Sequence, residues 1–406
     1  MTLDTLIDIL YIGAGNITFG NDNVLWNHSL RVERLLGPRL NVVAIIDPNY
    51  ERYKQVLGQK LASSAAAAYK TTKYFPSLQS PGALDYLTST NIDLFILGTP
   101  PLYRGTTYPN RDLELEILKH FGNKPTIFLE KPVAVTRPDQ PLEVAHSLND
   151  ARLTIGVGYM MRYLKVVQKA KSIISKNNLT VSCIIARYAN AYQRVRKVDW
   201  WTKSQQGGPI IEQATHFCDL VRYLGGEVIM ESVKSQALEH WEPAGKLSHQ
   251  CIDESAIPAN DRIPRATTAM WKFESGAVGT LIHVVALHGI RFSNEITIYA
   301  DGYQLRLREL YTTPTLYVRS PESDTEEKVY TYPGDDPFFN EMETFISVAA
   351  KRANKPLPDR CNSTEADEPP PAEEILTSYE DACKTFAMTW KIRDESEIKA
   401  DYERSF

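Results

Sequence analysis

The sequence predicts an α/β protein, in which an N-terminal domain with a parallel sheet precedes an α/β domain with a large, open, mainly antiparallel sheet. Two observations carry this prediction. Up to about residue 160, short apolar runs alternate with helix-like stretches, and beyond it long segments rich in β-forming residues dominate. The length of 406 residues is enough for two domains that each bury a core.

Five apolar runs predict the strands of the first domain. They are short and predominantly apolar, as is typical of strands buried on both faces of a parallel sheet. Helix-like stretches at 47–64 and 113–121 separate them and predict crossover connections. The runs cover residues 7–12, 41–46, 92–97, 126–129 and 152–158.

We expect a first domain at 1–135 and a second at 136–406. In the second domain the predicted helices are 163–176, 209–224 and 372–390, and the long loops are 241–264 and 352–372. The predicted strands are 180–190, 227–239, 266–274, 277–287, 293–300, 303–310 and 314–319.

Composition excludes several classes of function. The net charge of −5 argues against nucleic-acid and anionic-membrane partners, and no run approaches the roughly 18 apolar residues of a membrane span. The N-terminus lacks the basic character of a secretory signal. Five scattered cysteines without a CxxC pair favour a reducing compartment, so we expect a cytoplasmic protein. They are Cys183, Cys218, Cys251, Cys361 and Cys383.

A glycine turn follows the first predicted strand. In Gly13-Ala14-Gly15-Asn16-Ile17-Thr18, the first glycine permits the turn and the second lets the backbone approach a pyrophosphate. Thr18 stands where the dinucleotide fingerprint has its third glycine. Asp47, at the end of the second strand, is the acid expected to bind the adenosine ribose hydroxyls, although it comes later than usual. We interpret residues 1–135 as a dinucleotide-binding Rossmann domain.

An acid at position 47 disfavours the 2′-phosphate of NADP by charge repulsion, so the expected cofactor is NAD. Arg52 lies near enough in sequence to weaken this argument and leaves NADP possible. The predicted cofactor-binding residues are Gly13, Gly15, Asn16, Ile17, Asp47, Arg52, Thr99, Pro100, Glu130 and Lys131.

Two proline-containing motifs end the third and fourth strands. In Thr99-Pro100-Pro101 and Glu130-Lys131-Pro132, proline ends regular hydrogen bonding and exposes the groups before it. Lysine at such a point can bind a substrate hydroxyl or carbonyl oxygen and stabilise developing charge there. The alternative is a solvated lysine on a loop.

The predicted helix at 209–224 carries a candidate acid/base pair. Glu212 and His216 are four residues apart, so a regular helix would present them on one face, and Asp219 could orient the imidazole. The alternative is a histidine inside a helix that is satisfied by its carboxylate neighbours. The spacing is not that of a HExxH zinc site, so no metal is expected.

Aromatic and basic residues at 188–201 form a candidate substrate wall or an interface, and His283 and His288 either line the same pocket or decorate the sheet. The predicted substrate contacts are Arg104, Tyr159, Arg162, Tyr192, Trp200 and Asp219.

In order and spacing, these motifs resemble the Gfo/Idh/MocA oxidoreductase family. The resemblance rests on the glycine turn, Asp47, the Thr-Pro-Pro and Glu-Lys-Pro motifs, and the stretch from Gly207 to Asp219. It implies hydride transfer between a nicotinamide and a secondary alcohol or ketone of a sugar, a cyclitol or another small biosynthetic compound. Lys131 would contact the reacting oxygen, and His216 would be the acid/base. The family's open sheet often joins two subunits, so a homodimer is expected.

The chain departs from the family at two positions. Glu212 replaces the usual aspartate, and Arg104 stands where many members have histidine, which would suit an acidic or more oxidised substrate unless it contacts the cofactor or the fold. Two other functions stay open: redox-neutral, NAD-dependent elimination of a glycosidase-like kind, and a non-catalytic nucleotide-sensing regulator.

Overall fold

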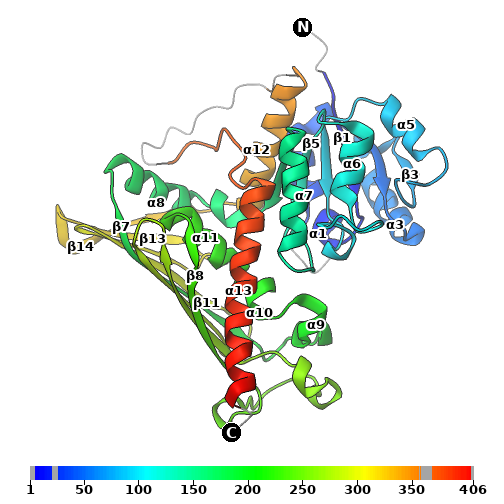
Figure 1. Ribbon diagram of the computed structural model, residues 1–406. Helices are drawn as coiled ribbons and strands as arrows, with labels where there is room; N and C mark the ends of the chain where they lie inside the picture. The colour runs from blue at the N-terminus through cyan, green and yellow to red at the C-terminus, as the bar shows by residue number, and fades with distance from the viewer. Residues whose placement is uncertain (1–4, 21–25, 356, 358–367, 404–406) are drawn as a thin grey trace. The chain divides into compact units, whose positions relative to one another are not determined.

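The computed structural model describes residues 5–20, 26–355, 357 and 368–403 (Figure 1). Cys361 and most of the loop expected at 352–372 lie outside the described residues. The chain forms two compact units, each considered by itself. The first contains the described residues among 1–163, 336–366 and 370–383, and the second contains those among 164–335, 367–369 and 384–406.

A six-stranded parallel sheet forms the centre of the first unit. Its strand order is β3-β2-β1-β4-β5-β6, the order of a doubly wound dinucleotide-binding fold. All five predicted strands are present, and the short strand β3 was not predicted. The strands are β1 (Ile7–Ile12), β2 (Leu40–Ile46), β3 (Lys73–Phe75), β4 (Leu94–Leu97), β5 (Thr126–Glu130) and β6 (Thr154–Gly158).

Helices from both ends of the chain complete the first unit. They are α1 (Asn16–Phe19), α2 (His28–Leu36), α3 (Tyr50–Leu61), α4 (Ala66–Tyr69), α5 (Ala83–Ser89), α6 (Leu113–Phe121), α7 (Asp139–Asp150) and α12 (Pro337–Arg352), with 3₁₀ turns η1 (Gly37–Arg39), η2 (Pro101–Tyr103) and η3 (Met160–Tyr163). The helix α12 shares one apolar core with α2, α3 and the sheet, and Phe345 packs edge-on against Phe128 at 5.0 Å. The boundary predicted at residues 135 and 136 therefore falls inside this unit, because β6 continues the sheet.

An eight-stranded sheet forms the second unit, in the order β14-β13-β12-β11-β7-β10-β9-β8. Its pairs are antiparallel except for β7 with β10, which confirms the mainly antiparallel prediction. The polar strand β14 was not predicted, because its exposed charged residues lack an apolar alternation. The strands are β7 (Val181–Ala191), β8 (Val228–Leu238), β9 (Ala266–Phe273), β10 (Val278–Leu287), β11 (Ser293–Ala300), β12 (Tyr303–Arg308), β13 (Thr315–Ser320) and β14 (Ser323–Thr331).

Helices pack against one face of this sheet, with α11 on β7 and β10 and α8 on β12 and β13 (Figure 1). The helical elements are α8 (Lys165–Lys176), α9 (Lys203–Gln206), α10 (Pro209–Glu212) and α11 (Thr215–Gly225), with 3₁₀ turns η4 (Val198–Trp201), η5 (Pro243–Gly245), η6 (Glu254–Ala256) and η7 (Ala259–Asp261). The last helix, α13 (Tyr379–Glu403), begins later and ends later than the predicted 372–390.

Close packing at Gly98 explains why the glycine turn tolerates Thr18. The Thr18 side chain is fully buried, and a Cβ atom on Gly98 would lie 2.0 Å from its Oγ1 atom. The third glycine of the fingerprint normally allows close packing between helix and strand. Here the missing side chain is at the end of β4 instead, so threonine fits in α1.

We expect Gly98→Ala to lower the free energy of unfolding by about 1–3 kcal/mol, because the new methyl group overlaps Thr18. Adding Thr18→Ala should restore at least half of the loss. Urea unfolding of both single variants and the double variant measures the coupling. Gly58→Ala is the control, since a Cβ atom there meets nothing within 4 Å. Additive losses in the double variant would contradict this packing account.

Candidate active site

The carboxyl ends of four parallel strands form one edge of the first sheet. The register pairs Ile12 with both Ile46 and Leu97, and Leu97 with Leu129. The residues that follow these four are Gly13, Asp47, Gly98 and Glu130. The predicted cofactor-binding motifs therefore begin along a single edge, which is where ligands bind in open parallel sheets.

The glycine turn has the conformation that the sequence predicts. Gly13 has a φ of +99°, and a Cβ atom there would lie 2.8 Å from the carbonyl carbon of Gly98. A Cβ atom on Gly15 would meet nothing within 4 Å, so the space beside this residue is open. Gly15 and Asn16 are exposed and Ile17 is half-buried. The turn can thus receive a pyrophosphate at its surface.

Asp47 and Arg52 both hold the glycine turn. One carboxylate oxygen of Asp47 accepts the Ala14 N–H at 2.7 Å, and the other accepts the Asn49 N–H at 2.8 Å. The guanidinium of Arg52 donates to the carbonyl oxygens of Ala14 at 2.9 Å and Gly20 at 2.8 Å. These bonds fix both side chains at the turn, and their predicted contacts with a cofactor stay predictions.

A tyrosine cluster beside Asp47 was not predicted. Tyr53 lies between Tyr50 and Tyr74, with ring centroids 6.0 and 4.5 Å away. Burial, and then the charge of Asp47, raise the pKa of Tyr74, which keeps its hydroxyl protonated. Tyr50 follows Asp47 by three residues and is 51% exposed. The two tyrosines that closely follow the acid, Tyr50 and Tyr53, were the signal available in the sequence.

Arg104 is a buried brace of the first unit. Its side chain is 1% exposed, and the guanidinium donates to the carbonyl oxygens of Thr99 at 3.2 Å, Pro132 at 2.5 Å and Val133 at 3.1 Å. Burial lowers its pKa, whereas the charge of Glu114 raises it. These contacts favour the alternative that Arg104 stabilises the fold over the prediction that it binds substrate. They also connect the two proline-containing motifs.

Lys131 directly follows β5, and its backbone N–H donates to the Oε2 atom of Glu130 at 3.1 Å. The Nε2 atom of His28 lies 2.6 Å from the other carboxylate oxygen of Glu130. Sequence reasoning did not identify His28, because 102 residues separate the pair and no local pattern connects them.

In the second unit, the helix predicted at 209–224 is two helices. The helix α10 ends at Glu212 and α11 begins at Thr215. The N–H groups of Gln213 and Ala214 both donate to the carbonyl oxygen of Pro209, which widens the turn between the helices. The prediction of one continuous helix was therefore wrong, and the pairing of Glu212 with His216, which rested on a regular helix, stays a prediction. Glu212 is half-buried and His216 is 6% exposed.

Gln213, in the break between these helices, binds the sheet. Its Oε1 atom accepts hydrogen bonds from Asn190 Nδ2 at 2.7 Å and His283 Nε2 at 2.9 Å. Burial lowers the pKa of His283 to about 3, so this imidazole is neutral at physiological pH. His283 consequently supports the helix break and is a poor acid/base candidate.

An aromatic cluster surrounds the candidate acid/base segment. Tyr188 stacks on Phe217 with centroids 5.2 Å apart, and the His216 ring lies 6.5 Å from that of Tyr311. Burial, and then the charge of Glu212, raise the pKa of Tyr188, so its phenol stays neutral. The hydroxyl of Tyr188 is thus protonated in a largely apolar setting.

Asp219 is fully buried, and its Oδ1 atom accepts a hydrogen bond from Thr385 of α13 at 3.3 Å. Arg222 donates to the same threonine at 2.8 Å and forms an ion pair with Glu227. Asp219 thus helps to fasten α11 to α13. Its predicted contacts with His216 and with substrate stay predictions.

Three further residues that were predicted to contact substrate are buried, namely Tyr159, Arg162 and Tyr192. The hydroxyl of Tyr192 lies 3.1 Å from His288 Nε2. The Tyr192 ring packs in an apolar cluster that also contains Trp201. Tyr159 is fully buried, and Arg162 donates to the carbonyl oxygen of Leu376 at 2.6 Å. The polar atoms of Tyr192 and Arg162 thus have partners within the protein, and the predicted substrate contacts of the three side chains stay predictions.

Trp200, also predicted to bind substrate, is half-buried. Its ring lies edge-on to Trp201, with centroids 4.8 Å apart. It packs against the outside of the Tyr192 cluster, and its predicted substrate contact stays a prediction.

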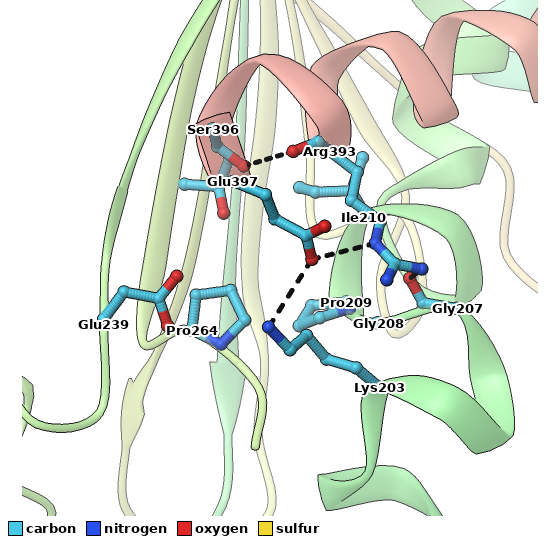
Figure 2. A pocket seen from close by; sticks show the side chains of 11 residues that line it. Lys203, Gly207, Gly208, Pro209, Ile210, Glu239, Pro264, Arg393, Ser396 and Glu397 are labelled. Atoms are coloured by element: carbon cyan, nitrogen blue, oxygen red, sulfur yellow. Dashed lines mark hydrogen bonds and ion pairs between the residues drawn. The ribbon is translucent and has the colours of Figure 1, made fainter. Parts of the chain in front are cut away.

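A small cavity in the second unit lies beside the glycines that precede α10 (Figure 2). Glu397 of α13 accepts from Arg393 at 3.1 Å and from Lys203 at 3.5 Å at its rim. The cavity has a volume of about 20 Å³, which holds a water molecule or two and is too small for a sugar. The ion pairs of Glu397 therefore support the position of Gly207, whose carbonyl oxygen also accepts a hydrogen bond from Arg393.

Within the described ranges, no group of three or more His, Cys, Asp or Glu side chains is arranged to hold a metal ion. No helix in this part of the chain is long and apolar enough to cross a membrane.

Comparisons with known proteins identify both domains. A model of the oxidoreductase family's NAD-binding Rossmann fold matches residues 7–159, and one of an oxidoreductase C-terminal domain matches residues 162–303. Protein C12C2.04 of Schizosaccharomyces pombe, which is uncharacterized, is 40% identical over 95% of both chains. The 2,7-anhydro-N-acetylneuraminate hydratase of Escherichia coli is 26% identical over 36% of this chain and 37% of its own.

Solved structures have the same fold at low sequence identity. The levoglucosan dehydrogenase complex with NADH and L-sorbose has a TM-score of 0.65 at 16% identity, with 97% of each chain covered. The regulator Gal80p of Saccharomyces cerevisiae, as a super-repressor mutant, has a TM-score of 0.70 at 14% identity, also with 97% of each chain covered. The domain matches, together with the glycine turn and Glu130-Lys131-Pro132 at the sheet edge, show that the chain belongs to the Gfo/Idh/MocA family of NAD-binding oxidoreductases.

Proposed function

We propose that this protein is a dehydrogenase or reductase that transfers hydride between a nicotinamide cofactor and a secondary alcohol or ketone of a small, sugar-like compound. The main support is Lys131, which follows β5 at the edge that also carries the glycine turn and Asp47. A cation there can bind the reacting oxygen and stabilise alkoxide-like charge. The bound nicotinamide would supply the hydride chemistry.

In this proposal His216 exchanges the proton of the substrate hydroxyl, and Glu212 positions the substrate or the imidazole. An imidazole exchanges protons readily near neutral pH, which suits this role. The ring of Tyr311, which is 36% exposed and lies beside the buried Tyr188, provides an apolar surface on which the carbon face of a sugar can pack. The broken helix gives Glu212 and His216 separate backbone supports.

For the cofactor, we propose NAD in preference to NADP. Asp47 is half-buried and carries negative charge at the end of β2, where a 2′-phosphate would be repelled. The guanidinium of Arg52 is already used by the carbonyl oxygens of Ala14 and Gly20. This use weakens the argument that Arg52 would bind a 2′-phosphate.

Two observations favour second candidates. The relative that is a hydratase suggests redox-neutral chemistry, in which product forms without net accumulation of NADH. The fold shared with Gal80p suggests a regulator, which would bind the cofactor and turn over no substrate. A chain that only binds the cofactor would have no chemical reason to retain both Lys131 and His216, so we rank catalysis first.

We also propose that the open face of the large sheet joins two copies of the chain. Ile185, Thr280 and Met270 lie in one row across β7, β10 and β9, and Met270 is 62% exposed. Val278 and Tyr299 flank this row with exposures of 44% and 40%. An exposed apolar patch of this kind favours association.

The first test of the proposed activity is a substrate panel with levoglucosan, L-sorbose, D-glucose, myo-inositol and UDP-N-acetylglucosamine. Each compound is assayed with NAD and NADP in the direction that its oxidation state allows, at the absorbance of the reduced nicotinamide. We expect Lys131→Met to lower kcat by at least about 100-fold, because the oxygen loses its cation. NADH affinity by fluorescence should change less than about 3-fold, and Lys119→Met is the exposed control. Wild-type turnover by Lys131→Met would end the assignment.

Asp47→Asn tests the cofactor preference, since it removes the charge and keeps an oxygen for the Ala14 N–H. The ratio of kcat/KM for NADP to that for NAD should rise at least about 10-fold through the lost repulsion. Asp85→Asn, on the exposed face of α5, should leave the ratio unchanged. An unchanged ratio in Asp47→Asn would contradict the proposed NAD preference.

Met270→Glu tests the association of two chains. We expect a dimer for the wild-type protein and a monomer for the variant, because the charge would be buried in the interface. Light scattering after size-exclusion chromatography measures the mass. Leu61→Glu changes another exposed apolar residue, on α3, and should stay dimeric. A monomeric wild-type protein would refute the proposed interface.

A further inference from the structure

The buried side chains of His28 and Glu130 contact each other next to the backbone of Lys131. We propose that His28 is a positioning residue that fixes Lys131 by holding the carboxylate of Glu130. The inference rests on the proposed function, in which Lys131 contacts the reacting oxygen. Neither the cofactor motifs nor the acid/base segment includes His28.

The geometry uses both oxygens of one carboxylate. The Nε2 atom of His28 lies 2.6 Å from Glu130 Oε1, and the backbone N–H of Lys131 donates to Glu130 Oε2 at 3.1 Å. The side chains of His28 and Glu130 are 0% and 12% exposed. Because a carboxylate only accepts hydrogen bonds, the imidazole donates through Nε2–H. A fully buried donor of this kind forms a strong, well-defined bond.

The imidazole is itself held rigidly. Its ring lies edge-on to Phe128 of β5 at 4.9 Å and to Phe338 of α12 at 5.9 Å. His28 is the first residue of α2, and the preceding Asn27 caps the helix by accepting the Leu30 N–H at 3.0 Å. The same asparagine donates to the carbonyl oxygen of Phe19 in α1. These contacts hold the imidazole beside Glu130.

A second contact fixes the start of α2 to α12. Arg31 forms an ion pair with Asp336 at 2.9 Å, and its guanidinium also lies over the Phe338 ring. Asp336 in turn caps α12 by accepting the Phe339 N–H. Through this chain of contacts, the position of Glu130 depends on two helices that flank the sheet.

The backbone at Lys131 is consequently held by hydrogen bonds both at this residue and at the next. Glu130 holds its backbone nitrogen, and Arg104 holds the carbonyl oxygen of the next residue, Pro132, at 2.5 Å. Without the donor of His28, the Oε1 atom of Glu130 would lose its hydrogen bond in a side chain that is only 12% exposed, and burying an unpaired carboxylate oxygen is costly. The carboxylate would then move, and the backbone of Lys131 would lose its anchor. Displacements of about 1 Å at a reacting group can cost about 100-fold in rate.

The experiment compares two substitutions of His28 in the full-length protein with NAD bound. His28→Gln keeps an amide donor near the place of Nε2, whereas His28→Leu keeps the volume and removes the donor. His120→Leu is the matched control, because His120 also faces a glutamate, Glu116, at 3.5 Å, but near the surface. Lys131→Met is measured in parallel. The assay uses the panel substrate with the highest kcat/KM, and fluorescence titration with NADH serves as the substrate-free probe.

We expect His28→Leu to lower kcat by about 10- to 100-fold while NADH affinity changes less than about 3-fold. His28→Gln should keep at least half of the wild-type kcat, and His120→Leu should match the wild type. Equal losses in His28→Gln and His28→Leu would reduce His28 to a packing residue and overturn the proposal. Wild-type kcat in His28→Leu would overturn it as well. If His28→Leu does not fold, His28→Asn replaces it, since the shorter amide cannot reach Glu130.

Two further measurements distinguish a failure of this inference from a failure of the proposed function. Normal turnover by Lys131→Met would refute the proposed function, whereas impaired Lys131→Met with normal His28→Leu would refute only the role of His28. The buried Nε2 proton should also give a low-field proton resonance that disappears in His28→Leu and shifts in Glu130→Gln. Absence of that resonance in the wild-type protein would contradict the hydrogen bond itself, whatever the activity.

Discussion

Parallel pairing of β1 with its two neighbours is the constraint on which the first unit depends. Since Ile12 is paired with both Ile46 and Leu97, the residues that follow these strands must meet at one edge. Pairing of the strand backbones thereby brings together three segments that lie far apart in the sequence. The hydrogen bonds of Asp47, Arg52 and Arg104 to backbone groups then make this edge rigid.

The sequence predicted most of this edge because its signals are local. Short, predominantly apolar runs mark buried parallel strands, and glycine or proline after a run marks the turn that exposes the motif. The break after Glu212 was missed because it arises from two N–H groups that share the Pro209 carbonyl oxygen, which no periodicity of side chains records. The helix α12 and the strand β14 were also missed. The latter is an exposed edge strand without alternation.

The roles of single polar residues could be predicted less well than the strands. Arg104, Arg162 and Tyr192 are of residue types that often bind substrates, yet the two arginines donate to backbone carbonyls and the Tyr192 hydroxyl faces His288. Whether an arginine faces solvent or a buried carbonyl depends on long-range packing. The same holds for His28 and Glu130, which meet only after the sheet has assembled. Motifs thus locate a site, whereas the supporting contacts need the three-dimensional structure.

The late position of α12 in the chain has a consequence for biosynthesis. Residues 5–158 contain every strand of the first sheet, but the apolar face that Phe345 and its neighbours cover stays open until the ribosome has made Pro337–Arg352. At roughly 5–20 residues per second this takes about 10–40 s after β6 emerges. During that interval an aggregation-prone surface is exposed on the nascent chain. Molecular chaperones that shield apolar surfaces would therefore matter more here than for a domain that is continuous in sequence.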